Sequence, residues 1–469
     1  MSYNPENQYR CTIIRGKSQS EMEDWLPFYA QTVHKFCPCT KNEFDMRCNK
    51  EFSKFLFKNE DYDGLTDANK KTIRNHITEI MGKLFGLYYR TSDDIVNESP
   101  SCAFLLEKND FPAFFKNICL NLQFPNFADS FKTLQERVSK KINIRPLCYI
   151  VKFLDYARKQ QNNLAMSKQE IGYYILNNLE VLQGTVSVDE VYSRILSDRK
   201  SKIHRAKLTG SHDWQHIKEQ FNLLELSNIV ESDADYIWLN GDEENAILTF
   251  IKKCEQPIFD VYTYNLHSKS DKKQLEFAWD FYYGKLNPEI LKMETPFNKI
   301  VIESDVKREK TAVGYSTNEL GDKGEAFVYR MECNRVRAYK ERLVNKVLLL
   351  GKTKGLGYDI SSIEANENPQ KPEFARYIEV KTTTRMSEPK FDENWKDFVS
   401  LSAKEWIAAE QHREFYNIYR VYFTKTKVIV MKINNPFQKN INNEIDVYAT
   451  NYKMDFTAKV LTKQYEERI

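Results

Sequence analysis

The sequence predicts a multidomain protein in which a largely helical N-terminal half precedes an α/β domain. The chain has 469 residues, more than one hydrophobic core normally organises. Through the first half, apolar residues recur every three to four positions, as in amphipathic helices. In the last third the pattern changes to helix, short strands, helix and strands. We therefore expect at least two domains of different class.

Composition narrows the class of protein. Hydrophobic residues make up 41% and charged residues 29%, which suits a folded chain and not a disordered one. No run of about 18 apolar residues occurs, so we expect no membrane span. The first residues lack the apolar stretch of a secretory signal, so we expect a cytoplasmic protein whose nine cysteines are mostly reduced. The net charge of +3 neither favours nor excludes a nucleic-acid partner.

Residues 1–140 are expected to be helical. Two typical stretches are EMEDWLPFYAQTVHKF and KKTIRNHITEIMGKLFGLYY. Their apolar residues recur at three to four positions, so this part is expected to be largely helical.

Residues 141–255 are expected to form a winged helix. Pro146 suits the first turn of one helix, and Ser167 and Glu170 have the spacing of a capping box at the start of a second. Two further helices fit VSVDEVYSRILSDRK and DWQHIKEQFNLLELSNI, and SDADYIWLNGDEENAILTFIKKC fits a strand pair with a closing helix. Helices followed by a small hairpin are typical of a winged helix.

A winged helix is a variant of the helix-turn-helix, which places one helix in the major groove of DNA. The basic run SDRKSKIHRAK lies in this region and is a candidate for phosphate contacts. Its basic residues are Arg199, Lys200, Lys202, His204, Arg205 and Lys207. The alternatives are a winged helix that binds protein and a basic run that is only solvated surface.

Residues 256–300, with Pro257, Pro288 and Pro296, are expected to be a connector. Residues 301–469 follow as the α/β domain. Its first helix, GDKGEAFVYRMECNRVRAYKERL, carries Glu325 and Glu332. The expected strands are NKVLLLG, GLGYDISSIEA, RYIEVKTTTR, NIYRVYFTK and KVIVMKI. Between them lies the helix LSAKEWIAAEQHREF, in which Ser402 and Glu405 fit a capping box and Leu401 can pack on Trp406.

The strand RYIEVKTTTR presents a carboxylate and an ammonium on one face. Side chains alternate along a strand, so Glu379 and Lys381 point one way and Val380 points into the core. Asp359 ends the preceding strand, so two carboxylates and one ammonium can converge in the order D…E-x-K. Asp359, Glu379 and the Val380 carbonyl could bind Mg²⁺, while Lys381 orients or deprotonates a water and stabilises charge on a phosphate. The alternative is a structural salt bridge between strands.

A family resemblance covers about residues 320–430. Through GEAFVYRMECN, GLGYDISS, RYIEVKTTT, FVSLSAKEWIAA and YNIYRVYF the chain resembles the NO VEIN C-terminal type of domain in the PD-(D/E)xK nuclease superfamily. The resemblance implies a restriction-endonuclease-like fold and Mg²⁺-dependent hydrolysis of phosphodiester bonds in DNA, with Mn²⁺ as a possible substitute. By motif match Asp359, Glu379 and Lys381 take the catalytic positions and Glu325 the accessory acidic position. Gly-Tyr stands before Asp359 in place of proline.

The first half of the chain more loosely resembles the DNA-recognition regions of type II restriction enzymes. The combined prediction is a sequence-specific restriction or phage-defence endonuclease that cuts double-stranded DNA, with a dimer forming on DNA to cut both strands. The phosphate-loop pattern G-x-x-x-x-G-K-[ST] is absent, so no nucleoside triphosphate is expected. The alternatives are an inactive DNA-binding regulator or scaffold and an RNA-cleaving nuclease.

Three smaller groups have candidate roles. His34, Cys37, Cys39 and Cys48 could bind zinc, although C-x-C departs from the usual C-x₂-C spacing, and buried thiols are the simpler interpretation. Thr382, Thr383 and Thr384 are strand formers, one of which could touch a DNA phosphate. Lys404 and His412 are expected on the surface.

Overall fold

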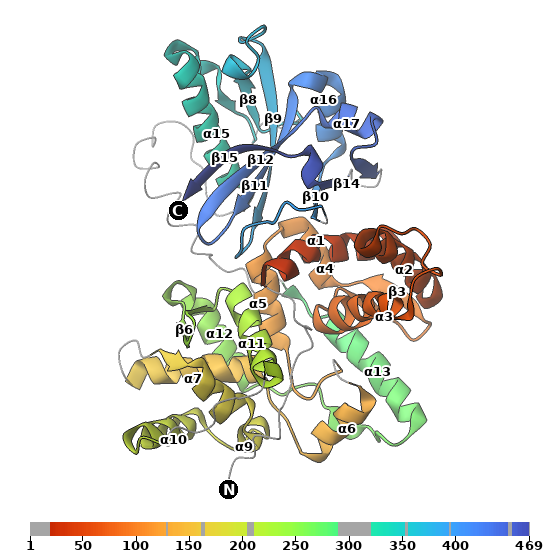
Figure 1. Cartoon of the computed structure of the whole chain (residues 1–469), viewed down its shortest axis with the longest axis vertical. Helices are drawn as coiled ribbons and strands as arrows, with labels where there is room; N and C mark the ends of the chain where they lie inside the picture. Colours follow the sequence, from red (N-terminus) through yellow and green to blue (C-terminus); the bar gives the residue numbers. More distant parts are fainter. Residues whose placement is uncertain are drawn as a thin grey trace. The chain divides into compact units, whose positions relative to one another are not determined.

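The computed structural model describes residues 19–127, 130–160, 165–203, 211–288, 320–351, 355–393, 395–448 and 453–468. Of the expected features, His204, Arg205, Lys207 and residues 289–300 of the connector lie outside the described residues. The chain divides into two compact units, and it is a mixed helical and sheet protein (Figure 1). Unit 1 consists of Met1–Glu21, Thr32–Leu105 and Phe111–Thr295, and unit 2 of Met22–Gln31, Leu106–Asp110 and Pro296–Ile469.

The described residues between 19 and 140 are mostly helical, as expected, but they also contain a small sheet. The elements are α1 (Gln19–Phe36), β1 (Cys39–Thr40), α2 (Lys41–Phe57), α3 (Asp67–Asn75), the π-helix η1 (His76–Leu84), β2 (Tyr88–Arg90), β3 (Ile95–Glu98), α4 (Pro100–Lys108), α5 (Phe111–Asn121) and α6 (Phe131–Ser139). Strands β1, β3 and β2 pair antiparallel in that order.

Within KKTIRNHITEIMGKLFGLYY the helical run stops before the end of the stretch. The helical run ends before Gly86, which has φ +57, a backbone conformation that favours glycine. A Cβ at Gly86 would also lie 2.9 Å from the ring of Tyr283. The two tyrosines that follow, Tyr88 and Tyr89, therefore enter strand β2.

The second part of unit 1 packs helices around another small antiparallel sheet. Its elements are α7 (Pro146–Gln160), β4 (Met166–Ser167), α8 (Lys168–Ile171), the π-helix η2 (Gly172–Leu176), α9 (Leu179–Leu182), α10 (Val188–Lys200), α11 (Ser211–Leu226), β5 (Val230–Ser232), β6 (Tyr236–Leu239), η3 (Gly241–Glu243), α12 (Glu244–Cys254), η4 (Val261–Thr263) and α13 (Lys269–Gly284). The strand order is β4-β6-β5. The capping box of Ser167 and Glu170 is confirmed. The winged-helix assignment stays a prediction.

Unit 2 is built on a six-stranded sheet with the order β15-β12-β11-β9-β8-β7. Its elements are α15 (Leu320–Tyr339), η6 (Glu341–Lys346), β7 (Leu348–Leu349), β8 (Ile360–Ile363), η7 (Ala365–Glu367), β9 (Ala375–Thr384), β10 (Lys396–Ser400), α16 (Ala403–His412), η8 (Arg413–Phe415), β11 (Tyr416–Phe423), β12 (Lys427–Asn434), α17 (Pro436–Ile441), β13 (Asp446–Tyr448), β14 (Lys453–Thr457), η9 (Ala458–Val460) and β15 (Thr462–Arg468). Strands β9 and β11 run parallel, and the other neighbours in this sheet run antiparallel.

Helices cover both faces of the central sheet, α15 on one and α16 on the other (Figure 1). Alternation along β9 sends Ile378 and Val380 into the core beneath α15. Tyr377 packs instead against the core beneath α16, where Leu401 and Trp406 both lie, as the capped-helix pattern predicts. Glu379 and Lys381 follow Tyr377 at intervals of two and share its face.

Two short segments from the N-terminal half of the sequence belong to unit 2 and bind the end of β9. The Asn109 carbonyl accepts hydrogen bonds from the Thr384 N–H at 3.0 Å and the Thr383 hydroxyl at 2.8 Å. Arg385 donates to Asp24 over 2.7 Å, and the buried Glu23 carboxylate accepts from the Met386 N–H over 2.6 Å. The strand that carries Glu379 and Lys381 therefore ends on these two segments.

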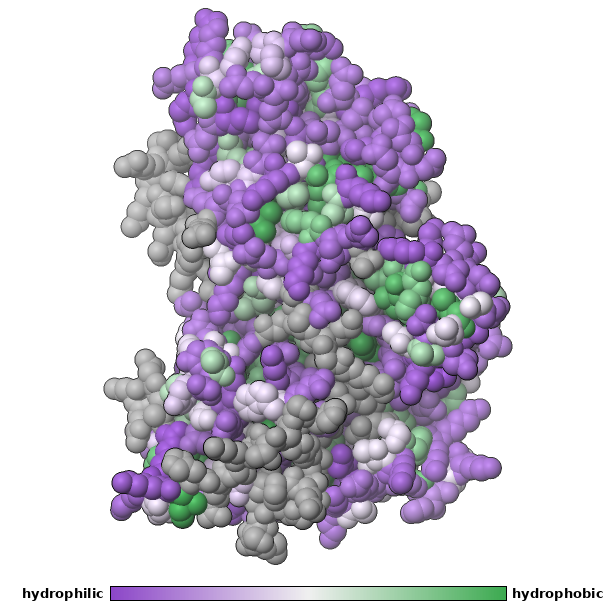
Figure 2. Space-filling model, viewed as in Figure 1, coloured by the Kyte–Doolittle hydropathy of each residue, from purple (hydrophilic) through white to green (hydrophobic). Residues whose placement is uncertain are grey.

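The part of the surface visible in Figure 2 is mainly hydrophilic, with hydrophobic side chains in small groups. Among the described residues, no helix is both long enough and apolar enough to span a bilayer.

Candidate functional site

The acidic residues Asp359 and Glu379 meet where β8 begins beside β9. The sequence placed Asp359 at the end of its strand, but it immediately precedes the start of β8 (Ile360–Ile363), so that placement is wrong. The Asp359 N–H donates to the Ile378 carbonyl over 2.9 Å, so the residue still lies beside β9. Its side-chain Oδ2 accepts a hydrogen bond from the Val380 N–H at 2.8 Å. This bond places the Asp359 carboxyl close enough to the Glu379 carboxyl that, after desolvation, its negative charge also raises the pKa of Glu379. Antiparallel pairing of β8 with β9 fixes this approach.

Lys381 lies between two carboxylates. Its Nζ is 2.6 Å from Glu379 Oε1 and 3.0 Å from Glu405 Oε2. Glu405 belongs to the first turn of α16, where Ser402 and Glu405 form the expected capping box. The Glu379 side chain is only 4% exposed, whereas those of Lys381 and Glu405 are each 21% exposed. The structure thus brings Asp359, Glu379 and Lys381 together and adds Glu405.

Burial governs the electrostatics of this acidic cluster, which we define as Asp359, Glu379, Lys381 and Glu405. Desolvation raises the pKa of Glu379 well above its usual range, although the Lys381 ammonium opposes the shift. Desolvation also raises the pKa of Asp359, against the Val380 N–H and Lys381. Burial by itself would lower the pKa of Lys381, but Glu379 and Glu405 outweigh it and the pKa is raised. Lys381 therefore stays protonated near neutral pH.

Tyr416 and Gly357 form the wall of the site next to α16. The Tyr416 hydroxyl donates to the Gly357 carbonyl over 2.9 Å. Burial, followed by the negative charges of Glu379, Glu405 and Asp359, raises the pKa of Tyr416. Gly357 has φ +77, and a Cβ there would lie 2.5 Å from the Lys404 carbonyl oxygen. Only glycine lets the loop before Asp359 approach α16 this closely.

Glu325 lies at the edge of this region. Its Oε2 would be 2.1 Å from a Cβ at Gly351, so its carboxylate lies against that glycine. The adjacent Leu350 N–H donates to the Asp359 carbonyl over 2.6 Å. The other acid singled out on this helix, Glu332, is fully buried and pairs with Arg335 at 2.6 Å, which indicates a structural role.

Sequence reasoning missed the part that Glu405 and Tyr416 take in the site. The capping box already explained Glu405, and a place in a buried strand already explained Tyr416, so neither pattern pointed to a site. His412, which was expected on the surface, is half-buried and stacks on Tyr377 with ring centroids 3.8 Å apart. Lys404 is exposed, as expected.

The threonines after Lys381 are not available to DNA. Thr383 and Thr384 are each only 1% exposed, and both bind Asn109. Thr382 points to the other face, where Gly324 of α15 lies so close that a Cβ would meet its hydroxyl at 1.9 Å. A phosphate contact by Thr383 or Thr384 is therefore excluded by burial.

The three described basic residues of the run SDRKSKIHRAK differ in how freely their charges could contact a phosphate. The Arg199 guanidinium makes a two-point ion pair with Glu170, with contacts of 2.7 and 2.6 Å. Lys200, the last residue of α10, and Lys202, two residues beyond it, are exposed. Of this described group, Arg199 is the one held by a carboxylate that also caps α8.

The four candidate zinc ligands have other surroundings. His34 Nδ1 is 2.7 Å from Glu98. Cys37, Cys39 and Cys48 are free thiols, and burial raises the pKa of each. In the portion of the chain that the structure describes, no group of three or more His, Cys, Asp or Glu side chains is arranged to hold a metal ion.

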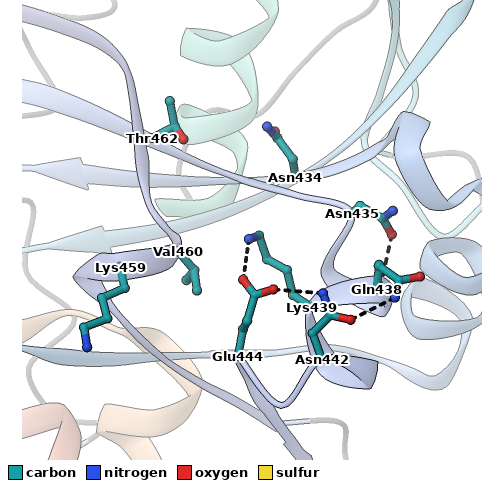
Figure 3. A pocket seen from close by; sticks show the side chains of 9 residues that line it. All are labelled: Asn434, Asn435, Gln438, Lys439, Asn442, Glu444, Lys459, Val460 and Thr462. Carbon is teal, nitrogen blue, oxygen red and sulfur yellow. Dashed lines mark hydrogen bonds and ion pairs between the residues drawn. The ribbon is translucent and has the colours of Figure 1, made fainter.

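A separate surface pocket of about 280 Å³ lies beside α17 (Figure 3). It is lined by Asn434, Asn435, Gln438, Lys439, Asn442, Glu444, Lys459, Val460 and Thr462. Several of these polar side chains bind one another: Lys439 pairs with Glu444 at 2.8 Å, and Gln438 donates to Asn442 at 3.0 Å (Figure 3). The pocket shares no residue with the acidic cluster.

Comparisons with known proteins match two regions of the chain. Residues 3–280 match the family described as restriction endonuclease BpuJI, N-terminal. The chain belongs to this BpuJI N-terminal family. A solved structure of the BpuJ1 endonuclease binding domain, in complex with pyrene- and phenanthrene-modified DNA, is 40% identical in sequence. It superposes with a TM-score of 0.53 and covers 61% of this chain and 100% of that domain.

The BpuJI N-terminal match ends before the acidic cluster, which lies in a second matched region. Residues 324–433 match the Protein NO VEIN C-terminal family, and this confirms the resemblance seen in the sequence. No curated protein matches the chain. The protein thus joins a restriction-endonuclease N-terminal region of the BpuJI type to a NO VEIN C-terminal region.

Proposed function

We propose that the chain is an Mg²⁺-dependent endonuclease of the PD-(D/E)xK type that hydrolyses phosphodiester bonds in double-stranded DNA, as a sequence-specific restriction or phage-defence enzyme. The observation that carries the proposal is the contact of Asp359, Glu379 and Lys381 in a chain of a restriction-endonuclease family. The DNA in the complex of the BpuJ1 binding domain supports DNA as the substrate.

The donor set of the acidic cluster suits Mg²⁺. Asp359 and Glu379 provide adjacent hard oxygen ligands. Burial raises the pKa of each, and the charge of Lys381 opposes this shift. Mg²⁺ is commonly held by one or two carboxylates together with water and phosphate oxygens, so no closed cage of three side chains is needed. In this proposal Asp359, Glu379 and the Val380 carbonyl hold the ion.

When bound, Mg²⁺ supplies polarisation of the scissile phosphate and a lowered pKa of a water ligand. Lys381 contributes a permanent positive charge, because its raised pKa keeps it protonated. This favours charge stabilisation on the phosphate over proton abstraction, the two roles that the sequence left open. Glu325, beside Gly351, is the accessory acid of the proposal.

The remaining roles are assigned by region. Unit 1 would read the duplex, and the three-stranded sheet β4-β6-β5 with its surrounding helices supports a winged-helix reader. Lys200 and Lys202 would contact phosphates. Because each chain provides one acidic cluster in its described residues, cutting both strands would require two protomers on DNA. No nucleoside triphosphate is needed.

The test is cleavage of varied plasmid and phage DNA in Mg²⁺, with fragment ends mapped. The unmodified chain should give discrete fragments, and Lys381→Ala should bind DNA but not cut it. Lys404→Ala is the matched control, since it removes an exposed ammonium from α16 without touching the acidic cluster. DNA binding without cleavage by the unmodified chain would favour an inactive DNA-binding protein, and cleavage of RNA alone would favour an RNA nuclease.

A further inference from the structure

The carboxylate of Glu405 is held in place from two directions. Its Oε2 accepts the Ser402 N–H over 2.9 Å, which is the capping-box bond at the start of α16. The same oxygen lies 3.0 Å from Lys381 Nζ. The helix start therefore fixes the Glu405 carboxylate whether or not Lys381 is present.

The charge balance of the acidic cluster suggests a role for the Glu405 carboxylate. Asp359, Glu379 and Glu405 carry three negative charges when ionised, against the single ammonium of Lys381. That ammonium is 2.6 Å from the same Glu379 carboxylate that is proposed to bind the metal. A metal ion and Lys381 thus compete for Glu379. Because an ammonium has three donors, Lys381 can keep a second carboxylate as its partner when Glu379 turns to a metal.

We infer that Glu405 is a positioning residue that retains the Lys381 ammonium in the site when Glu379 binds the metal, an inference that rests on the proposed nuclease function. Glu405 does not touch the metal or the DNA in this scheme. It makes metal binding easier by offering Lys381 a charged partner other than Glu379, and it keeps the ammonium within reach of the phosphate.

A capping role alone makes a different prediction, and two variants separate the two roles. Glutamine serves as well as glutamate at the third position of a capping box, so Glu405→Gln keeps the cap and removes the charge. Ser402→Ala removes the side chain that accepts from the Glu405 N–H, but leaves the Ser402 N–H that binds the carboxylate. Thermal unfolding of both variants reports the cap, and metal affinity reports the charge.

The decisive experiment is a double-mutant cycle. Mn²⁺ binding to the full chain without DNA is measured by titration calorimetry in each variant. Glu405→Gln should raise the Mn²⁺ dissociation constant by about tenfold, as loss of a group that orients a metal site commonly does. In a Lys381→Met background, where nothing competes for Glu379, the same substitution should have little effect. Ser402→Ala should lower the unfolding temperature and leave Mn²⁺ affinity unchanged.

The outcomes distinguish this inference from the proposed function. An equal loss of affinity in both backgrounds would mean that Glu405 acts on the metal directly, and no loss in either would leave only the cap, so each overturns the inference. If the unmodified chain neither binds Mn²⁺ nor cuts DNA, the proposed function fails and the inference fails with it. If it binds and cuts while Glu405→Gln matches it in affinity, the inference alone is overturned.

Discussion

Replacement of Gly357 by alanine should damage the candidate site through geometry alone. The added Cβ would lie 2.5 Å from the Lys404 carbonyl oxygen and 2.8 Å from the Ala408 Cβ, and both neighbours belong to α16. Alanine at φ +77 costs about 1–2 kcal/mol. Relief of the overlap by movement of packed backbone costs about 1–3 kcal/mol more. The expected loss in the free energy of unfolding is therefore about 2–5 kcal/mol.

The functional effect follows from the position of Gly357, two residues before Asp359. A loop that moves away from α16 carries the carboxylate with it, and a misplacement of about 1 Å can cost about 100-fold in rate. Calorimetric unfolding measures the loss of stability, and single-turnover cleavage at one temperature measures the loss of rate. DNA binding is measured in parallel. Gly321→Ala is the control, because nothing lies within 4 Å of its Cβ and it sits in the first turn of α15. Unchanged unfolding and cleavage in Gly357→Ala would refute the reasoning.

Substitutions at three further positions test the fold. Asn109 has φ +53, so Asn109→Ala should lower the free energy of unfolding by about 1–2 kcal/mol. Asn109→Gly should lower it less, because glycine tolerates that φ. Equal losses of the two variants in chemical denaturation would contradict this. Lys116→Met should cost about 3–5 kcal/mol because it leaves Glu243 buried without the cation now 2.6 Å away, and a change below 1 kcal/mol would count against it. Burial raises the pKa of Asp280 from 3.8 to about 6, so the folded state binds a proton that the unfolded state has lost. Stability should fall as pH rises from about 4 to 6, and Asp280→Asn should remove that fall in denaturation curves measured across this range.

Local patterns predicted those features of unit 2 that depend on spacing within one element. The two-residue period of a strand is sufficient to place Glu379 and Lys381 on one face, and the capping box of Ser402 and Glu405 is a four-residue signal. The contact between Lys381 and Glu405 joins a strand to a helix that lies further along the chain. Neither the strand period nor the capping-box spacing says which residues of two different elements will meet. The catalytic and DNA-contact assignments themselves stay predictions.

The sheet of unit 1 that the sequence did not reveal has a similar explanation. Strands β1, β2 and β3 are 2, 3 and 4 residues long, too short for an alternating pattern to stand out from neighbouring helices. The signal that could have marked the break is Gly86, because a glycine near the end of a helical run often adopts positive φ.

The binding of Asn109, Asp24 and Glu23 to the end of β9 limits how this protein can be cut and recombined. A gene fragment that starts at residue 296 would encode the six-stranded sheet but leave Thr383, Thr384 and Arg385 without the partners they have in the full chain. Transplanting unit 2 onto another protein would therefore require grafts at three places in the host sequence. Recombining the chain with another protein at residue 296 would give chimaeras in which the end of β9 lacks Asn109, Asp24 and Glu23.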